Sequence, residues 1–263
     1  MAQSGTGGPR PGAPFTSDFH LSITKALADQ LSASLAKLEP AQLSDDTLAG
    51  VAPRGGVYQL FYNTELVYIG KADRNLADRL RQHKRKITGR ENIRTIDIAF
   101  TALYVDEDLS AVAPETLLIN QHRTSGALPW NFNGFGNKDP GRERDTSAVE
   151  DDHFDRLYPA DLEFVCETVT VGRHLVGDVL VLLKRELPYV FRYAGGNRSK
   201  SSQPREYWEN SIDIPAPRMS AIELFKIIAS AMPGWQITAL PGYVIMYKER
   251  RQFPSQRWAI YND

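Results

Sequence analysis

Two tripeptides whose tyrosines lie ten residues apart constrain the fold most strongly. Gly-Val-Tyr occupies residues 56–58 and Tyr-Ile-Gly occupies residues 68–70. Each lies in a short β-branched and aromatic run, 57–61 and 66–69, of the kind found in strands. The four residues between the runs suit a hairpin connection. The sequence therefore predicts two paired strands that each carry a tyrosine.

A helix, a strand and a second helix are predicted after this hairpin. Between residues 75 and 86 the apolar residues recur at helical spacing and place His83 on the same side as Leu76 and Leu80, and Gly89 ends the pattern. Residues 95–105 are typical of a third strand. Pro114 suits the first position of a helix that continues to about residue 123. The order of elements predicts an α+β core with a small three-stranded antiparallel or mixed sheet flanked by helices.

The regions around this core differ in composition. Residues 1–17 are rich in Gly, Pro and Ser and predict a disordered leader. An amphipathic helix is expected over 21–38, and the C-terminal third shows further strand and helix patterns. The expected divisions are a leader (1–17), an N-terminal helical segment (18–54), the α+β core (55–141), an acidic linker or loop (142–160) and a C-terminal α/β extension (161–263). Within that extension we expect strands at 162–169, 235–240 and 243–247 and helices at 174–187 and 220–232.

The charge is unevenly distributed, although the net charge is only -1. Residues 71–94 contain nine basic and three acidic side chains, and residues 143–167 contain nine acidic and two basic ones. A basic run beside the tyrosine motifs indicates a nucleic-acid partner. The single cysteine, Cys166, excludes an intrachain disulfide and a Cys/His zinc cluster. Because no apolar run reaches the ~18 residues of a membrane span, we expect a cytoplasmic protein.

Four further polar residues follow the tyrosines in an ordered series. Arg79 and His83 lie four residues apart, so a helix presents both on one face. Glu115 falls in the first turn of the next predicted helix, and Asn131 follows in a Gly- and Pro-rich loop at 126–141. With the two tripeptides, this series resembles the GIY-YIG nuclease superfamily over residues 55–133. Val57 stands where the family name has isoleucine.

The resemblance implies a role for each residue around a scissile phosphate. It implies that Glu115 binds Mg²⁺, for which Mn²⁺ can substitute, and that Arg79 binds the phosphate. Tyr58 is the family's candidate general base; because a phenol of pKa ~10 is barely ionised at pH 7, we expect it to share this role with His83. Tyr68 orients water or a phosphate oxygen. The last position is Asn131 or Asn133; the run Leu-Pro-Trp-Asn favours Asn131, which is expected to hold the loop by amide hydrogen bonds.

The surroundings of the core resemble the type II restriction branch of the superfamily. The features are the stand-alone size, the helix before the motif and the loop at 130–141. This resemblance implies a homodimer that cuts a short palindrome in double-stranded DNA, leaves 5′-phosphate and 3′-hydroxyl ends, and is paired with a methyltransferase of the same specificity. Homing or repair endonucleases, a non-catalytic DNA-binding module and an unrelated α/β protein remain alternatives. The resemblance makes residues 55–141 the catalytic core, and the extension at 161–263 is expected to serve DNA binding or dimerisation. The candidate DNA contacts are Lys71, Arg74, Arg81, Lys84, Arg198 and Lys200.

Overall fold

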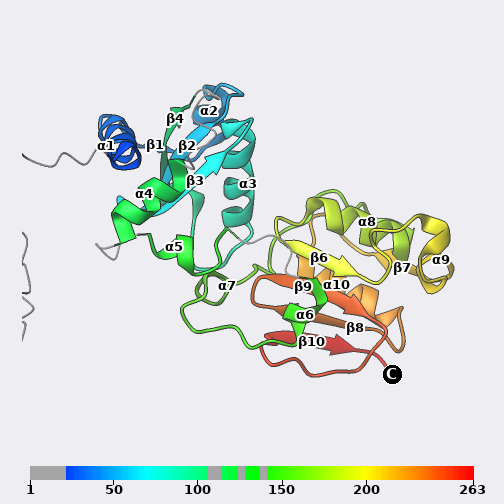
Figure 1. Ribbon diagram of the computed structural model, residues 1–263. Helices are drawn as coiled ribbons and strands as arrows, with labels where there is room; N and C mark the ends of the chain where they lie inside the picture. Colours follow the sequence, from blue (N-terminus) through cyan, green and yellow to red (C-terminus); the bar gives the residue numbers. More distant parts are fainter. Residues whose placement is uncertain (1–21, 106–113, 124–127, 137–140) are drawn as a thin grey trace, which may run out of the picture.

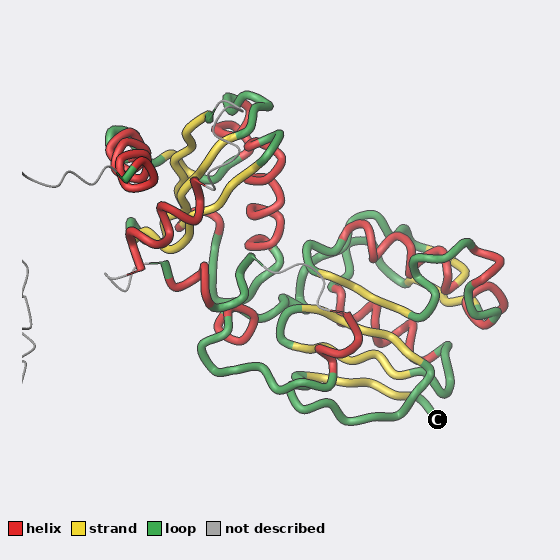
Figure 2. The backbone as a smooth tube through the Cα atoms, in the orientation of Figure 1, coloured by secondary structure: helices red, strands yellow, loops and turns green. Residues whose placement is uncertain are grey.

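The computed structural model describes residues 22–105, 114–123, 128–136 and 141–263, and it forms two units that are each built on a four-stranded sheet (Figures 1 and 2). The leader predicted at 1–17 lies outside the described residues. None of the helices in the described part of the chain is long and apolar enough to cross a membrane. Cys166 is buried, as befits a small apolar side chain.

The first sheet contains the predicted hairpin and is antiparallel throughout. Its order is β1-β4-β2-β3, so the three predicted strands are confirmed and a two-residue strand is added beside β4. The strands are β1 (Ala41–Gln42), β2 (Gly56–Tyr62), β3 (Glu65–Ala72) and β4 (Ile98–Tyr104). The hairpin turn is tighter than the four residues expected, because pairing continues to Tyr62 and Glu65 and leaves Asn63 and Thr64 at φ 48° and 71°. Two left-handed residues match the twist of the flanking strands.

Helices cover both faces of this sheet. Residues alternate between faces along a strand, so Tyr58 packs with Leu76 and Leu80 of α3, whereas Val57 packs with Leu31 and Leu118 on the opposite face. The Asn75 side chain begins α3 by accepting a hydrogen bond from the Asp78 amide at 3.2 Å. The helices of this unit are α1 (Ile23–Leu35), α2 (Asp45–Ala49), α3 (Leu76–Thr88), α4 (Pro114–Arg123) and α5 (Pro129–Phe132). The short α5 lies within the predicted loop at 126–141.

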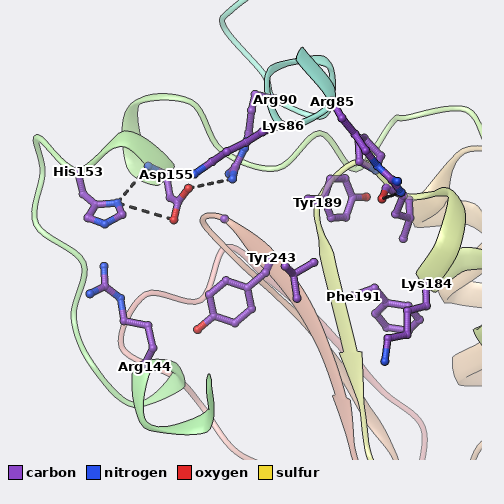
Figure 3. Close-up of a pocket in the computed structure, with 14 residues that line it drawn as sticks. Arg85, Lys86, Arg90, Arg144, His153, Asp155, Lys184, Tyr189, Phe191 and Tyr243 are labelled. Atoms are coloured by element: carbon purple, nitrogen blue, oxygen red, sulfur yellow. Dashed lines mark hydrogen bonds and ion pairs between the residues drawn. The ribbon is translucent and has the colours of Figure 1, made fainter. Parts of the chain in front are cut away.

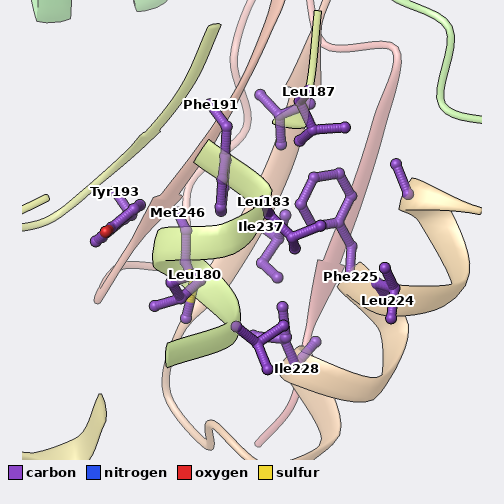
Figure 4. Close-up of a cluster of buried hydrophobic side chains, with 14 of the residues drawn as sticks. Leu180, Leu183, Leu187, Phe191, Tyr193, Leu224, Phe225, Ile228, Ile237 and Met246 are labelled. Atoms are coloured by element: carbon purple, nitrogen blue, oxygen red, sulfur yellow. The ribbon is translucent and has the colours of Figure 1, made fainter. Parts of the chain in front are cut away.

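The second unit has a sheet of order β10-β8-β9-β6. Leu180 and Leu183 of α8, together with Phe225 and Ile228 of α10, form a buried cluster against one face of this sheet (Figure 4). Ser220 begins α10 with a capping box that includes Glu223. The elements are α6 (Gly141–Asp145), α7 (Phe154–Leu157), β5 (Gly172–Leu175), α8 (Val176–Glu186), β6 (Val190–Tyr193), α9 (Glu206–Glu209), β7 (Ser211–Ile214), α10 (Ala221–Ser230), β8 (Gln236–Leu240), β9 (Tyr243–Tyr247) and β10 (Trp258–Tyr261).

The strand predicted at 162–169 is wrong. This segment makes only one isolated bridge, between Val165 and Ser220. Its carbonyl groups accept hydrogen bonds from the first amides of α10 at 2.9 Å, from Ala221 to Phe164 and from Ile222 to Leu162. Leu162, Cys166 and Val169 thus bury their side chains, while the backbone of the segment satisfies a helix end instead of a strand partner. The helix predicted at 174–187 begins later, at Val176, because residues 172–175 pair with β7.

Charged side chains join the two units at the C-terminal end of α3. The Arg90 guanidinium lies 2.9 Å from the Asp155 carboxylate, and Arg257 contacts Glu91 at 2.8 Å. Arg85 donates to main-chain carbonyls at the end of α8. Part of the basic run is therefore used inside the protein. The stretch predicted as an acidic linker supplies Asp155 to this junction and contains α6 and α7.

Candidate active site

The two tyrosines of the hairpin meet on the α3 face of the first sheet. Tyr58 pairs with Gly70 across the hairpin, and Tyr68 pairs with Leu60, so the tyrosines are diagonal neighbours with ring centroids 6.1 Å apart. Gly70 leaves the room that the Tyr58 ring occupies, because a Cβ at this position would lie 2.3 Å from the Tyr58 hydroxyl oxygen. The ten residues between Tyr58 and Tyr68 therefore place both side chains in one cluster on the same face of the sheet.

Arg79 and His83 of α3 both contact the Tyr58 hydroxyl. Its oxygen lies 2.7 Å from His83 Nε2, in a buried hydrogen bond, and accepts a hydrogen bond from Arg79 Nε at 3.3 Å. A second hydrogen bond, at 3.3 Å, joins Arg79 to the Gln82 side chain. The i,i+4 spacing predicted from the sequence therefore brings a cation and an imidazole to the same phenol oxygen.

The surroundings keep Tyr58 and His83 neutral. Burial raises the pKa of Tyr58 far above its ordinary range, and Tyr68 adds to the rise, while the Arg79 charge opposes it. Burial lowers the pKa of His83 well below its usual value, and the charges of Arg79 and Lys86 lower it further. In the tautomer of His83 that carries its proton on Nδ1, the Tyr58 hydroxyl donates to an unprotonated Nε2. The 2.7 Å separation gives a proton a direct path from oxygen to nitrogen, while both pKa shifts oppose a free tyrosinate beside a free imidazolium.

Phe135 holds the imidazole and Tyr68 in place, and the sequence did not identify it. Its ring stacks on His83 with centroids 4.9 Å apart and meets the edge of Tyr68 at 5.1 Å. Lys86, one turn after His83, donates to the Phe135 carbonyl. The alternation of Phe and Gly in the loop at 130–136 was the available signal, since aromatic residues in a Gly-rich loop require a packing partner.

Asn131 fixes the exposed side of the Tyr-Ile-Gly strand. Its amide accepts a hydrogen bond from the Ile69 N–H at 2.9 Å and donates to the Ile69 carbonyl at 2.8 Å. β3 is the edge strand, and the amide takes the place of a neighbouring strand at this residue. The Asn133 side-chain oxygen is buried without a hydrogen-bond partner among the described residues. Of the two candidate asparagines, Asn131 is therefore the one that holds the strand between the tyrosine and the glycine.

Glu115 lies within electrostatic reach of this cluster. Its side chain is partly buried in the first turn of α4. Burial raises its pKa, whereas Arg79 and Lys71 lower it. Its charge in turn raises the pKa of both site tyrosines. Among residues 22–105, 114–123, 128–136 and 141–263, no three His, Cys, Asp or Glu side chains form a group that could hold a metal ion.

The predicted DNA-contacting residues fall into two groups. Lys71 follows Gly70 on β3 and lies 2.8 Å from Asp73, and Lys84 lies 2.5 Å from Asp45. Arg74 and Arg81 are exposed on the same unit. Arg198 and Lys200 lie in the connection between β6 and α9 of the second unit, at the side of the molecule away from α3 (Figure 1). The structure therefore places the first four on the unit that carries the tyrosine cluster and the last two on the other unit.

The two tyrosines, Arg79 and His83 thus form one cluster on the first unit, with the Glu115 carboxylate nearby. Residues 65–163 match the Eco29kI GIY-YIG domain, which belongs to a family of restriction endonucleases. The chain contains a GIY-YIG domain. No curated protein sequence matches the chain.

This GIY-YIG domain makes the chain a nuclease, with DNA as its class of substrate. The matched segment begins at Glu65 and therefore contains Tyr68, Arg79, His83, Glu115 and Asn131. Tyr58 lies just before it, and the hairpin register brings it to the same site. The match continues to residue 163, through the segment that supplies Asp155 to α3. The α+β architecture, with helices on an antiparallel sheet, agrees with this family.

Proposed function

We propose that this protein is a type II restriction endonuclease that hydrolyses phosphodiester bonds at a specific short palindrome in double-stranded DNA. The observation that most strongly supports this proposal is the position of the Tyr58 hydroxyl, which contacts His83 at 2.7 Å and Arg79 at 3.3 Å. A cation and a proton acceptor on one oxygen suit a reaction in which water must lose a proton beside a phosphate. The match to a restriction-endonuclease family favours this role over a homing or repair enzyme.

Tyr58 and His83 act together in the proposed reaction. Attacking water gives a proton to the Tyr58 oxygen as Tyr58 passes its own proton to His83 Nε2. The water oxygen bonds to phosphorus while the bond to the 3′ oxygen breaks, and that oxygen takes a proton from solvent. The products carry a 5′-phosphate and a 3′-hydroxyl. The sharing matters because burial opposes a free tyrosinate, and the Arg79 charge stabilises negative character on the Tyr58 oxygen during the transfer.

Arg79, Tyr68 and Glu115 complete the proposed site. Arg79 stabilises charge on the phosphoryl oxygens, and Tyr68 orients the water or a phosphate oxygen through its hydroxyl. Glu115 is the carboxylate that would hold Mg²⁺, or Mn²⁺ in its place. A partly buried carboxylate fits a hard cation bound by one protein oxygen, waters and substrate phosphate. When bound, the metal supplies charge neutralisation at the phosphate.

The wider biology follows from the enzyme class. A palindromic site is matched by a homodimer whose two sites cut opposite strands. The proposed contacts to the DNA backbone on the catalytic unit are Lys71, Arg74, Arg81 and Lys84. On the second unit, a bent or long duplex would also reach Arg198 and Lys200. A methyltransferase of the same specificity would protect the host DNA.

Cleavage of unmethylated plasmid and phage DNA with Mg²⁺ tests the proposal. We expect discrete bands from the wild type, and none with EDTA or with Glu115→Gln. Tyr58→Phe removes only the hydroxyl and should lower the rate ~10²- to 10⁴-fold, while Tyr261→Phe, in β10 of the second unit, serves as the matched control. Binding without cutting by the wild type on several large unmethylated genomes would refute the restriction assignment and favour a non-catalytic DNA-binding module.

A further inference from the structure

A cavity of about 470 Å³ lies between the two units, beside the junction at the end of α3. Lys86 comes from α3 and Arg90 from just beyond its end, Arg144 comes from α6, and Phe191 and Tyr243 come from the second sheet (Figure 3). This volume falls in the range of ligand-binding sites. None of the residues proposed for the reaction lines it, so the cavity is separate from the active site.

The lining of the cavity is strongly basic. Five cationic side chains face one carboxylate, Asp155, which Arg90 already contacts at 2.9 Å. Arg144 makes no ion pair with another described residue, and in Figure 3 its side chain extends toward His153. Burial lowers the pKa of Lys86 to about 8, a shift that a bound anion would oppose. Unbalanced positive charge in a partly desolvated space favours an anionic ligand.

Two buried hydrogen-bond donors of the lining are unsatisfied. Tyr189 and Arg90 are 6% and 7% exposed, and the Tyr189 hydroxyl and Arg90 Nε have no hydrogen-bond partner among the described residues. A buried donor without a partner costs ~1–3 kcal/mol, so such atoms indicate a missing acceptor. Both donor atoms are covered in this structure, so an anion in the cavity meets the cationic groups directly and reaches the two donors once their side chains turn toward it.

The position of the cavity relates it to the DNA path. Lys86 lies seven residues after Arg79 on α3, which corresponds to ~10 Å of helix rise. Phosphates of one strand advance ~3.4 Å per nucleotide along the duplex axis, so this distance spans about three nucleotides. In a complex whose bound strand runs along α3 with its scissile phosphate at Arg79, a neighbouring phosphate would lie level with Lys86 at the edge of the cavity.

We propose that the cavity between the two units binds a phosphate group, and that this phosphate belongs to the DNA backbone a few nucleotides from the scissile bond. The second half of this inference rests on the proposed function. The cavity then acts as a clamp that fixes the substrate relative to both units, with Arg144 and Tyr189 as positioning residues.

The test compares two variants with matched controls. Arg144→Gln is paired with Arg142→Gln, which removes an equal charge from the same helix but outside the cavity. Tyr189→Phe is paired with Tyr207→Phe, another buried hydroxyl without a described partner, which lies in the core of the second unit. Duplex affinity is measured by fluorescence anisotropy in EDTA over a salt series, and unfolding temperature is measured in sodium phosphate and in sodium chloride of equal ionic strength.

We expect Arg144→Gln to weaken duplex binding about eightfold near 0.1 M salt and to reduce the salt slope by about 0.9. Tyr189→Phe should weaken it about fivefold. The controls should stay within twofold.

If phosphate alone stabilises the wild type but not Tyr189→Phe, and duplex affinity is unchanged in both variants, the ligand is a free phosphate compound and the DNA assignment is refuted. If neither duplex affinity nor phosphate stabilisation responds, the whole inference is refuted. A wild type that neither binds nor cuts DNA refutes the proposed function instead, and the phosphate measurement then decides the cavity alone.

Discussion

Replacement of Gly70 by alanine should disable the site while leaving the fold intact. The added Cβ would lie 2.3 Å from the Tyr58 hydroxyl oxygen and 2.7 Å from the Tyr68 ring, whereas ordinary contact begins at 3.4 Å. The Tyr58 hydroxyl must therefore move about 1 Å, which breaks its 2.7 Å hydrogen bond to His83. A misplacement of ~1 Å in a catalytic arrangement costs ~10²-fold in rate. We expect a loss of this size in the plasmid-cleavage rate of Gly70→Ala, with the circular dichroism spectrum unchanged.

Two comparisons make this test specific. Gly50→Ala is the control, because a Cβ there would meet only the Thr47 carbonyl at an ordinary 3.5 Å. In a Tyr58→Phe background the same Gly70→Ala change should cost far less than 10²-fold, because the hydroxyl that it displaces is already absent. A cleavage rate within twofold of wild type for Gly70→Ala, or full additivity of the two changes, would refute the assignment of the displaced hydroxyl to the reaction.

Three further predictions concern stability, measured by urea denaturation. Asn131→Ala removes both hydrogen bonds to Ile69 and should destabilise the protein by ~1–3 kcal/mol; a change below ~0.5 kcal/mol would contradict a role in holding β3. Burial lowers the folded-state pKa of His83 below its unfolded value, so the unfolded state binds more protons as pH falls below ~6.5 and stability should decrease there; His83→Gln should reduce this pH dependence, to which His153 contributes in the same direction, and an unchanged slope would contradict a buried neutral His83. Thr64, a β-branched residue at φ 71°, is strained, so Thr64→Gly should stabilise the hairpin by ~1 kcal/mol, and an unchanged or lower midpoint would show that the turn carries no strain.

The sequence was most informative where function and local geometry share the same residues. The tyrosine spacing predicted the hairpin, and the Arg79 to His83 spacing predicted a common helix face; both are confirmed by one hydrogen-bonded cluster. The strands 235–240 and 243–247 were also predictable, because Pro-Gly separates two apolar runs. In each case a local pattern determines the contact.

The features that the sequence did not predict depend on contacts between residues far apart in the chain, which local sequence patterns do not indicate. The strand-like run at 162–169 has the composition of a strand, and only the position of α10 decides that its carbonyls accept helix amides. Strands of four residues, such as β5 and β6, carry too few residues for a periodicity to be recognised. Phe135 was missed because its role requires His83 and Tyr68 to be close in space. Arg198 and Lys200 were selected by charge alone, and charge does not fix distance from the site.

The hydrogen bonds of Asn131 have a consequence for self-association. An edge strand offers free backbone groups to which a second chain can add, and β3 is the edge strand beside the catalytic tyrosines. With its N–H and C=O both bound to Asn131, Ile69 has no bond left to give to an incoming strand. Two copies of the chain would have to displace Asn131 before they could join their sheets through the middle of β3, so a pair that keeps this asparagine in place meets through another surface.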